Sequence, residues 1–401
     1  MKNICFLTNG MPYPPNTGGK SVSYNKIQVL KKHHNIYLAA ISANLKHADL
    51  ENIKSENSIK DILLLERPVI SLFNLGFMKV INVLFKFILT NVPLHQIKTL
   101  EFKESIMQFI LDNSIEIIFS EGTLMNTFLD FDILDKHHIK LINTVFDLEN
   151  KLFFEQHLPK SNFLTKIFLY FEKERIKRHE RLLLKKATTS ICLSCADYNV
   201  IVKNWHIKNV QVIPPLIAPS EHHYIPENPV KYILFSGSLS FYPNLHGINW
   251  FVQNILPTIV TDFPEIKLML ITNTKLQGHE AMSKYIVYKD PPVGEVQEYQ
   301  ANATLSIIPI FLGSGIKIKA IETLSTGTPT ITTEFVASAF PSENGTPLII
   351  ANTKEEFINE IYSLLKSATQ RKTVSLANIK YFNKYLNIEN NNFKWLNLID
   401  D

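Results

Sequence analysis

The chain has 401 residues, of which 45% are hydrophobic and 19% are charged. Its length exceeds what one ordinary core contains, so two domains are expected, and the composition excludes a disordered chain. The net charge of +4 is too small to indicate nucleic-acid binding, so we expect no nucleic-acid partner. Three cysteines cannot form a disulfide framework, which favours a reducing cytoplasm. No segment approaches the ~20 uninterrupted apolar residues of a membrane span.

The N-terminal half alternates short apolar strands with segments of helical period, as βαβ units do. We predict strands over 4–7, 35–40, 62–65, 115–120, 140–145 and 190–193. Between the first two strands, a helix is predicted over 20–32, directly after Gly18 and Gly19. This pattern predicts a parallel α/β domain over residues 1–215.

A second α/β pattern follows the segment 218–230, which contains three prolines and is the best linker candidate. The predicted elements are a strand over 232–235, a helix over 243–260, strands over 267–272 and 286–288, a helix over 293–303, a strand over 305–309, a helix after Gly315 and a strand over 330–333. We therefore predict a second domain over 231–375, and a C-terminal helix over 376–401 that packs back on the first domain.

Two segments each allow two interpretations, one of which is contact with a membrane. The apolar segment 69–90 is interrupted by Lys79, Asn82 and Lys86, which form one stripe of a helix. It is either a packed helix with one wet face or a helix on a membrane surface. Segment 160–186 has nine Lys or Arg and three Asp or Glu. It forms either a solvated basic face or a patch for anionic lipid or a phosphate-bearing acceptor.

The glycines are few, only 13 in the chain, and a group of them follows the predicted strand 305–309. Gly313, Ser314, Gly315 and Ile316 connect this strand to the next helix. Free main-chain N–H groups and the helix dipole at such a junction favour a phosphate group, and small residues let it approach closely. Without further signals, an ordinary strand–loop–helix remains the alternative.

Three charged side chains follow this loop. Lys317 and Lys319 add positive charge beside the expected phosphate position. Residues 315, 319 and 322 share one face of a helix, so Lys319 and Glu322 are expected to point at one ligand. The lysine suits a diphosphate, and the carboxylate of Glu322 suits a ribose diol. A solvated Lys–Glu pair is the alternative interpretation.

The whole string 306–329 resembles the donor-binding signature of group 1, family 4-type glycosyltransferases with the GT-B fold. The residues that match it are Gly313, Ser314, Gly315, Lys319, Glu322, Gly327 and Pro329. Lys317 stands where the family usually has Arg. Segment 235–244, with Gly237 and Ser238, resembles the opening of the family's C-terminal domain, and 12–19 resembles its first glycine loop.

The resemblance implies an α/β protein with two Rossmann-like domains whose parallel sheets face a central cleft. It implies that the domain over 1–215 is on the acceptor side and that the domain over 231–375 binds the nucleotide-sugar donor. It implies transfer of a sugar from a nucleotide-sugar donor to a saccharide or lipid-linked acceptor, with retention and without a metal or other cofactor, in cell-surface polysaccharide biosynthesis. We expect a cytoplasmic protein, with peripheral contact to the membrane through 69–90 and 160–186 as a further expectation. The catalytic residues expected are Lys319, Glu322 and Lys317. The donor-binding residues expected are Gly18, Gly19, Gly237, Ser238, Gly313, Ser314, Gly315, Ile316 and Thr323.

The chain departs from the family pattern at two positions. Ser314 replaces a Glu that many members have, and Phe146 stands where a His often precedes the residue equivalent to Asp147. A non-catalytic GT-B module that partners an active transferase therefore stays an alternative. The metal-type pattern at 130–132 and the Cys-x-x-Cys at 192–195 are interpreted as a surface turn or helix and as buried thiols.

Overall fold

The computed structural model describes residues 1–42, 47–66, 101–157, 162–229, 231–343 and 345–400. The chain divides into two compact units. Unit 1 contains residues 1–213 and 394–401, and unit 2 contains residues 214–393. The predicted segment 69–90 lies outside the described residues.

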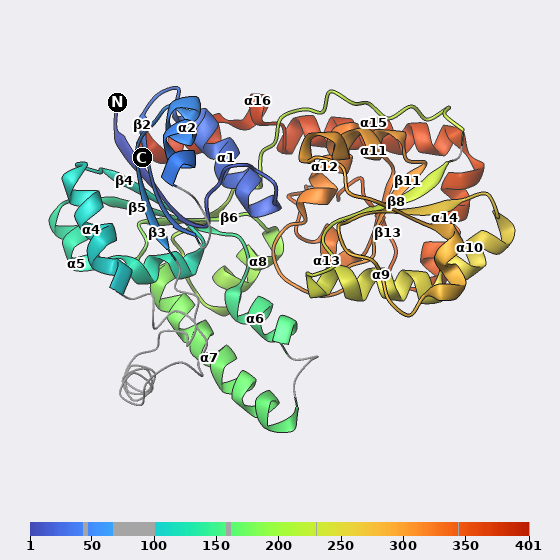
Figure 1. Ribbon diagram of the computed structural model, residues 1–401, viewed down its shortest axis with the longest axis horizontal. Helices are drawn as coiled ribbons and strands as arrows, with labels where there is room; N and C mark the ends of the chain where they lie inside the picture. The colour runs from blue at the N-terminus through green and yellow to red at the C-terminus, as the bar shows by residue number, and fades with distance from the viewer. Residues whose placement is uncertain (43–46, 67–100, 158–161, 230, 344, 401) are drawn as a thin grey trace. The chain divides into compact units, whose positions relative to one another are not determined.

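Unit 1 is built on a seven-stranded sheet with the order β3-β2-β1-β4-β5-β6-β7, in which every neighbouring pair is parallel (Figure 1). The strands are β1 (Asn3–Asn9), β2 (Asn35–Ser42), β3 (Ile59–Glu66), β4 (Ile117–Glu121), β5 (Lys140–Val145), β6 (Thr189–Cys192) and β7 (Val210–Val212). Its main helices are α1 (Gly18–Leu30), α2 (His47–Asn57), α4 (Phe102–Asp112), α5 (Phe131–Lys136), α6 (Glu149–His157), α7 (Phe163–Lys186) and α8 (Cys195–Asn199).

The order of unit 1 reverses between β1 and β4, so the crossovers leave this point in opposite directions. Ligands of open α/β sheets bind at the carboxyl ends of the strands beside such a switch point. The two central strands are apolar because helices cover both faces of a parallel sheet. Phe6 of β1 and Phe119 of β4 stack with ring centroids 5.1 Å apart, and both are fully buried.

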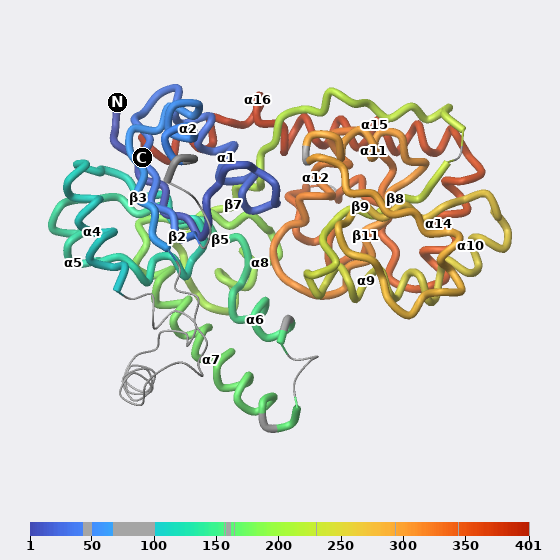
Figure 2. The backbone as a smooth tube through the Cα atoms, viewed as in Figure 1, coloured from blue at the N-terminus to red at the C-terminus, as the bar shows by residue number. Residues whose placement is uncertain are grey.

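Unit 2 is built on a six-stranded sheet with the order β10-β9-β8-β11-β12-β13, also parallel throughout. Its strands are β8 (Tyr232–Ser236), β9 (Lys267–Ile271), β10 (Ile286–Lys289), β11 (Leu305–Ile308), β12 (Thr330–Thr332) and β13 (Ile349–Ile350). Its helices are α9 (Tyr242–Asn254), α10 (Leu256–Asp262), α11 (Val296–Asn302), α12 (Ile318–Thr326), α13 (Glu334–Ala337), α14 (Lys354–Lys366), α15 (Ala368–Tyr385) and α16 (Ile388–Asn391). The tube in Figure 2 follows the chain through both units.

Two differences from the predicted elements concern the segment 243–260 and the C-terminal range. The helix predicted over 243–260 is divided at Ile255 into α9 and α10, since Pro257, in the first turn of α10, lacks the N–H that a continuous helix would use. The range 376–401, predicted as one C-terminal segment, is shared between the units. Helix α15 contacts α12 within unit 2. The last helix, α17 (Phe393–Asp400), accepts a bond from Lys2 Nζ at the carbonyl oxygen of Ile399, 2.7 Å away.

Candidate active site

The loop between β11 and α12 adopts backbone angles that require glycine. Gly313 has φ +118° and Gly315 has φ +69°. A residue in the left-handed region cannot belong to a right-handed helix, so the helix predicted after Gly315 begins at Ile318, as α12. The helix ends at Gly327, whose left-handed conformation lets its N–H reach the carbonyl oxygen of Thr323.

Lys319 lies in the first turn of α12 and its amine is drawn inward. Its Nζ donates to Oδ1 of Asn244 at 2.9 Å and lies 4.3 Å from the centre of the Phe235 ring. Burial, and next the charge of Lys317, lower the pKa of Lys319 to about 7, whereas Glu322 acts in the opposite direction. The amine of Lys319 therefore contacts a neutral amide oxygen and an aromatic ring.

The end of β8 completes this cluster. Asn244, in the first turn of α9, also donates from Nδ2 to the carbonyl oxygen of Ser238 at 2.8 Å. Gly237 has φ +138°, and a Cβ there would lie 2.4 Å from Lys319 Nζ. Only a glycine leaves room for the amine. The structure thus brings Gly237, Ser238 and Lys319 together, as the sequence implied, and adds Asn244, which was not predicted as a site residue.

Glu322 lies one turn further along α12. Its Oε2 accepts from Nε2 of Gln300, a fully buried residue of α11, at 3.2 Å. Burial raises the pKa of Glu322, and the Gln300 bond and Lys319 lower it. Gln300 is a second residue that sequence reasoning missed. Thr323, which was predicted to bind the donor, is 1% exposed. Its hydroxyl donates a hydrogen bond to the carbonyl oxygen of Ala320 within α12.

Lys317 precedes α12 and its amine turns back onto the loop. Its Nζ donates to the carbonyl oxygen of Ser314 and lies 5.9 Å from the centre of the Phe335 ring. Ser314 is 2% exposed and Ile316 is 9% exposed, so both side chains fill the interior beneath the loop.

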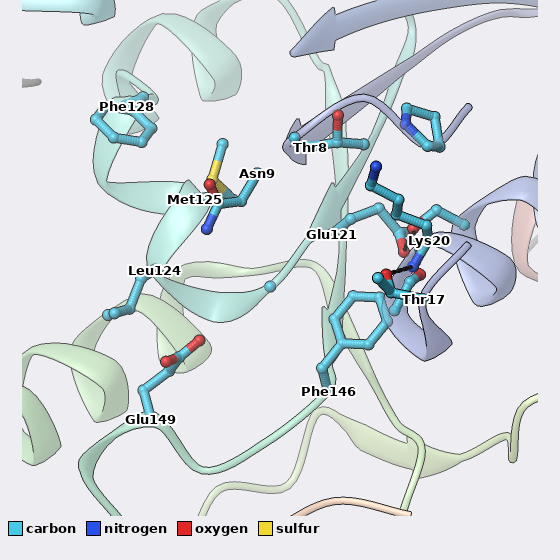
Figure 3. A pocket seen from close by; sticks show the side chains of 15 residues that line it. Thr8, Asn9, Thr17, Lys20, Glu121, Leu124, Met125, Phe128, Phe146 and Glu149 are labelled. Carbon is cyan, nitrogen blue, oxygen red and sulfur yellow. Dashed lines mark hydrogen bonds between the residues drawn. The ribbon is translucent and has the colours of Figure 1, made fainter. Parts of the chain in front are cut away.

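The first glycine loop belongs to unit 1. Gly18 and Gly19 begin α1, and the Thr17 hydroxyl accepts from the main-chain N–H of Lys20 at 3.5 Å. Gly19 lines a pocket of about 320 Å³ at the carboxyl ends of β1 and β4 (Figure 3). Other lining residues are Thr8, Lys20, Glu121, Phe146 and Glu149. We call this cavity the unit 1 pocket.

A buried ion pair forms one wall of the unit 1 pocket. Lys26 Nζ lies 2.6 Å from Oε1 of Glu121 and donates to Oγ1 of Thr144 at 2.8 Å. Oε2 of Glu121 accepts from the Ser23 hydroxyl at 2.8 Å. Both charged side chains are almost fully buried. The Glu121 carboxylate is thus neutralised and hydrogen-bonded within the wall.

Two further carboxyl residues, Glu149 and Glu180, connect the pocket to α7. The main-chain N–H of Glu149 donates to Oε1 of Glu180 at 3.0 Å, and Asn150 Nδ2 donates to Oε2 at 3.0 Å. Glu180 is fully buried, and burial raises its pKa well above the usual range. Burial and the charge of Asp147 raise the pKa of Glu149 to about 7.

The patterns set aside from the sequence have structural roles. Asp130 caps α5, accepting from the N–H of Ile133 at 3.3 Å, and forms an ion pair with Lys103. Cys195 begins α8, and burial raises the pKa of both its thiol and that of Cys192. Over the described part of the chain, there is no group of three or more His, Cys, Asp or Glu that could hold a metal ion.

The comparison with protein families gives a match within unit 2. Residues 230–367 match the family described as "Glycosyl transferases group 1". This part of the chain is therefore similar to group 1 glycosyltransferases. The glycine loop, Lys319 and Glu322 all lie within the matched range. A curated relative, an uncharacterized 44.6 kDa protein in the cps region of Klebsiella pneumoniae, is 20% identical over 395 residues and covers 94% of each chain.

Solved structures show that the chain has the GT-B fold. Sucrose-phosphate synthase from Thermosynechococcus elongatus is 14% identical with a TM-score of 0.69, covering 100% of this chain and 98% of that one. A point mutant of TarM from S. aureus, in complex with fondaparinux, α-GlcNAc-glycerol and UDP, is 11% identical with a TM-score of 0.68, covering 100% of both chains. HepE from Anabaena, with UDP and glucose, is 11% identical with a TM-score of 0.65 and the same coverage.

Proposed function

We propose that this glycosyltransferase is of the family 4 type and transfers a sugar, with retention and without a metal, from a nucleoside diphosphate sugar to a saccharide or lipid-linked acceptor. The observation that carries the proposal is the Lys319 cluster. An amine held by the Asn244 amide oxygen and the Phe235 ring, beside a glycine loop and a helix N-terminus, is suited to an anion. The diphosphate of the donor is that anion.

The chemistry follows from charge. When the glycosyl–phosphate bond breaks, negative charge grows on the diphosphate, and fixed cations and main-chain dipoles stabilise it. Lys319, Lys317 and the N–H groups of residues 313–316 supply these. Glu322, whose carboxylate is oriented by Gln300, accepts hydrogen bonds from the ribose hydroxyls. The departing phosphate takes the proton of the acceptor hydroxyl, which is consistent with retention.

The relatives support the donor and the biological role. TarM and HepE were both solved with UDP, which makes UDP the first nucleotide to test. The K. pneumoniae relative is encoded in a cps region, which supports a role in building a cell-surface polysaccharide.

Contact with an anionic membrane surface is part of this proposal and rests on α7. The helix contains eight Lys or Arg against three Glu. Its first turns expose Phe163 (76%), Tyr170 (57%) and Phe171 (73%). Exposed aromatic side chains beside basic ones suit the interface of an anionic bilayer. Within the described residues, no helix is long and apolar enough to cross a membrane. Sedimentation with anionic but not neutral vesicles is expected, and reduced in a Phe163→Ser, Phe171→Ser variant.

The deciding experiment measures thermal stability with UDP, GDP, ADP, dTDP and CMP, for wild type, Lys319→Ala and Glu322→Ala. A ligand at a hundred times its Kd stabilises the folded state by about 2.7 kcal/mol. We expect one nucleotide to raise the Tm of the wild type, with a smaller rise in both variants. No rise with any nucleotide would favour a non-catalytic GT-B module that partners an active transferase.

A further inference from the structure

A residue of the neighbouring helix α11 holds the carboxylate of Glu322. Gln300 is fully buried, and its Nε2 donates to Oε2 of Glu322 at 3.2 Å. An ionised carboxylate has about four positions at which it accepts a hydrogen bond. Gln300 takes one of them from the interior. Because Glu322 is only half-buried, the other positions are left for hydroxyl groups of a ligand.

The other contacts of Gln300 separate its main chain from its side chain. The main-chain carbonyl oxygen accepts from Oγ1 of Thr328 at 2.8 Å, which fixes α11 beside the segment that follows α12. The side-chain Oε1 is buried and has no hydrogen-bond partner among the described residues. Buried amides that hold a fold together normally use both ends. The main chain therefore anchors Gln300, and its side-chain amide is dedicated to Glu322.

The same hydrogen bond favours the ionised form of Glu322. Burial raises the pKa of this carboxyl group, and the Gln300 bond is the larger of the two effects that lower it. The other is the charge of Lys319, on α12, which is itself close to Lys317, before the helix. From α11, Glu322 meets the neutral amide. Hydroxyl groups donate more strongly to a carboxylate than to a protonated carboxyl group, so Gln300 keeps the acceptor in the form that a ribose needs.

We propose that Gln300 is a positioning residue for the nucleotide: it fixes Glu322 so that the carboxylate accepts from the 2′- and 3′-hydroxyl groups of the ribose, and it thereby sets a preference for ribonucleotides over 2′-deoxyribonucleotides. Gln300 is fully buried and acts through Glu322, without touching the ligand. The inference rests on the proposed function, because it concerns the donor of that reaction.

The test measures, by calorimetry on the full chain, the affinities for UDP, GDP and ADP and for the 2′-deoxy analogue of each. The wild type is expected to bind one ribonucleotide about tenfold more tightly than its analogue, which lacks one hydrogen bond to a charged group. In Gln300→Met, which keeps the length of the side chain, this preference should fall to about twofold or less. Gln300→Asn, whose amide is too short to reach Glu322, should behave in the same way and provides a second variant.

A pH series separates the Gln300 bond from packing. Without this bond the pKa of Glu322 rises further, so the carboxyl group of Gln300→Met is still protonated at a pH where that of the wild type is ionised. The ribonucleotide preference of the variant should therefore increase as the pH rises, and the wild type should reach its full preference at a lower pH. The ratio of the two affinities is the readout, because both nucleotides carry the same diphosphate and the titration of Lys319 cancels.

The matched control is Asn378→Leu, which removes a second buried amide of unit 2. Asn378 of α15 is also fully buried, donates from Nδ2 to the carbonyl oxygen of Thr328 at 2.9 Å, and has an Oδ1 without a hydrogen-bond partner among the described residues. Asn378→Leu should lower the Tm as Gln300→Met does, and leave the ribonucleotide preference unchanged. An equal loss of preference in both variants would show that loosening of unit 2 is the cause, and would overturn the inference.

A double variant tests whether Gln300 acts through Glu322. Glu322→Gln should lose the ribonucleotide preference at every pH, and adding Gln300→Met to it should cause no further change. If the wild type binds a nucleotide but shows no ribonucleotide preference, or if Gln300→Met keeps the full preference, this inference is overturned and the proposed function stands. If the wild type binds none of the nucleotides, both are overturned.

Discussion

Each unit has a lysine near its glycine loop, and the two lysines differ in their partners: Lys26 is fully buried and Lys319 is half-buried. Lys26 of unit 1 meets a carboxylate at 2.6 Å, so its charge is compensated within the protein. Lys319 of unit 2 meets an amide oxygen at 2.9 Å and the Phe235 ring, so most of its charge is left uncompensated. The comparison teaches that the partner of a lysine indicates its role: a carboxylate partner indicates a structural ion pair, and a neutral partner leaves the charge available to an anion.

The largest expected effect separates the two lysines by stability. Lys26→Met leaves a buried Glu121 unpaired and is expected to lower the free energy of unfolding by about 3–5 kcal/mol. Lys319→Met removes a half-buried charge that forms no ion pair among the described residues, and is expected to raise this free energy by about 1 kcal/mol. Urea denaturation measures both. Adding Glu121→Gln to Lys26→Met should recover part of the loss, and equal destabilisation by the two single variants would contradict the comparison.

The second effect concerns pH. The pKa of Lys319 is lowered to about 7 in the free protein, and a bound diphosphate raises it. Nucleotide binding above pH 7 therefore takes up a proton, and affinity is expected to fall by about tenfold per pH unit there. Calorimetry in buffers with different ionisation enthalpies measures the uptake.

Two variants sharpen this pH prediction. Asn244→Asp places a carboxylate beside the amine, raises the pKa of Lys319 and should move the loss of affinity to higher pH. Lys319→Arg should show no loss up to pH 9, because an arginine stays charged. An identical pH profile in all three proteins would show that another group titrates.

The smallest effect tests the space that Gly237 leaves. A Cβ at this position would lie 2.4 Å from Lys319 Nζ and 2.9 Å from Asn244 Nδ2, so Gly237→Ala should displace the amine and weaken UDP binding by about tenfold. Gly278→Ala is the matched control, because Gly278 also has a positive φ but nothing lies near its Cβ position. Equal UDP affinities in the two variants would mean that any weakening comes from the strain of a side chain at positive φ, and not from displacement of the Lys319 amine.

Much of this arrangement could be predicted from the sequence, because local patterns carried it. The strands of both sheets follow apolar runs, and the spacing of Lys319 and Glu322 already places them on one helix face. Asn244 and Gln300 were missed as site residues because their contacts join positions 75 and 22 residues apart. The pairing of Lys26 with Glu121, 95 residues away, likewise depends on the strand order. The exact start of the helix after Gly315, at Ile318, could not be predicted because spacing does not reveal φ.

The distribution of the chain over the two units has a consequence for how such enzymes exchange parts. Because residues 394–401 return to unit 1, the chain passes between the units twice, near 213 and near 393. A single junction near 213 would replace everything that follows it, so unit 2 cannot be exchanged by itself for that of a relative. Such a junction would also replace the last helix, where the carbonyl oxygen of Ile399 accepts a hydrogen bond from Lys2. A functional chimaera of this protein therefore needs two junctions, with the native tail kept beside its own N-terminus.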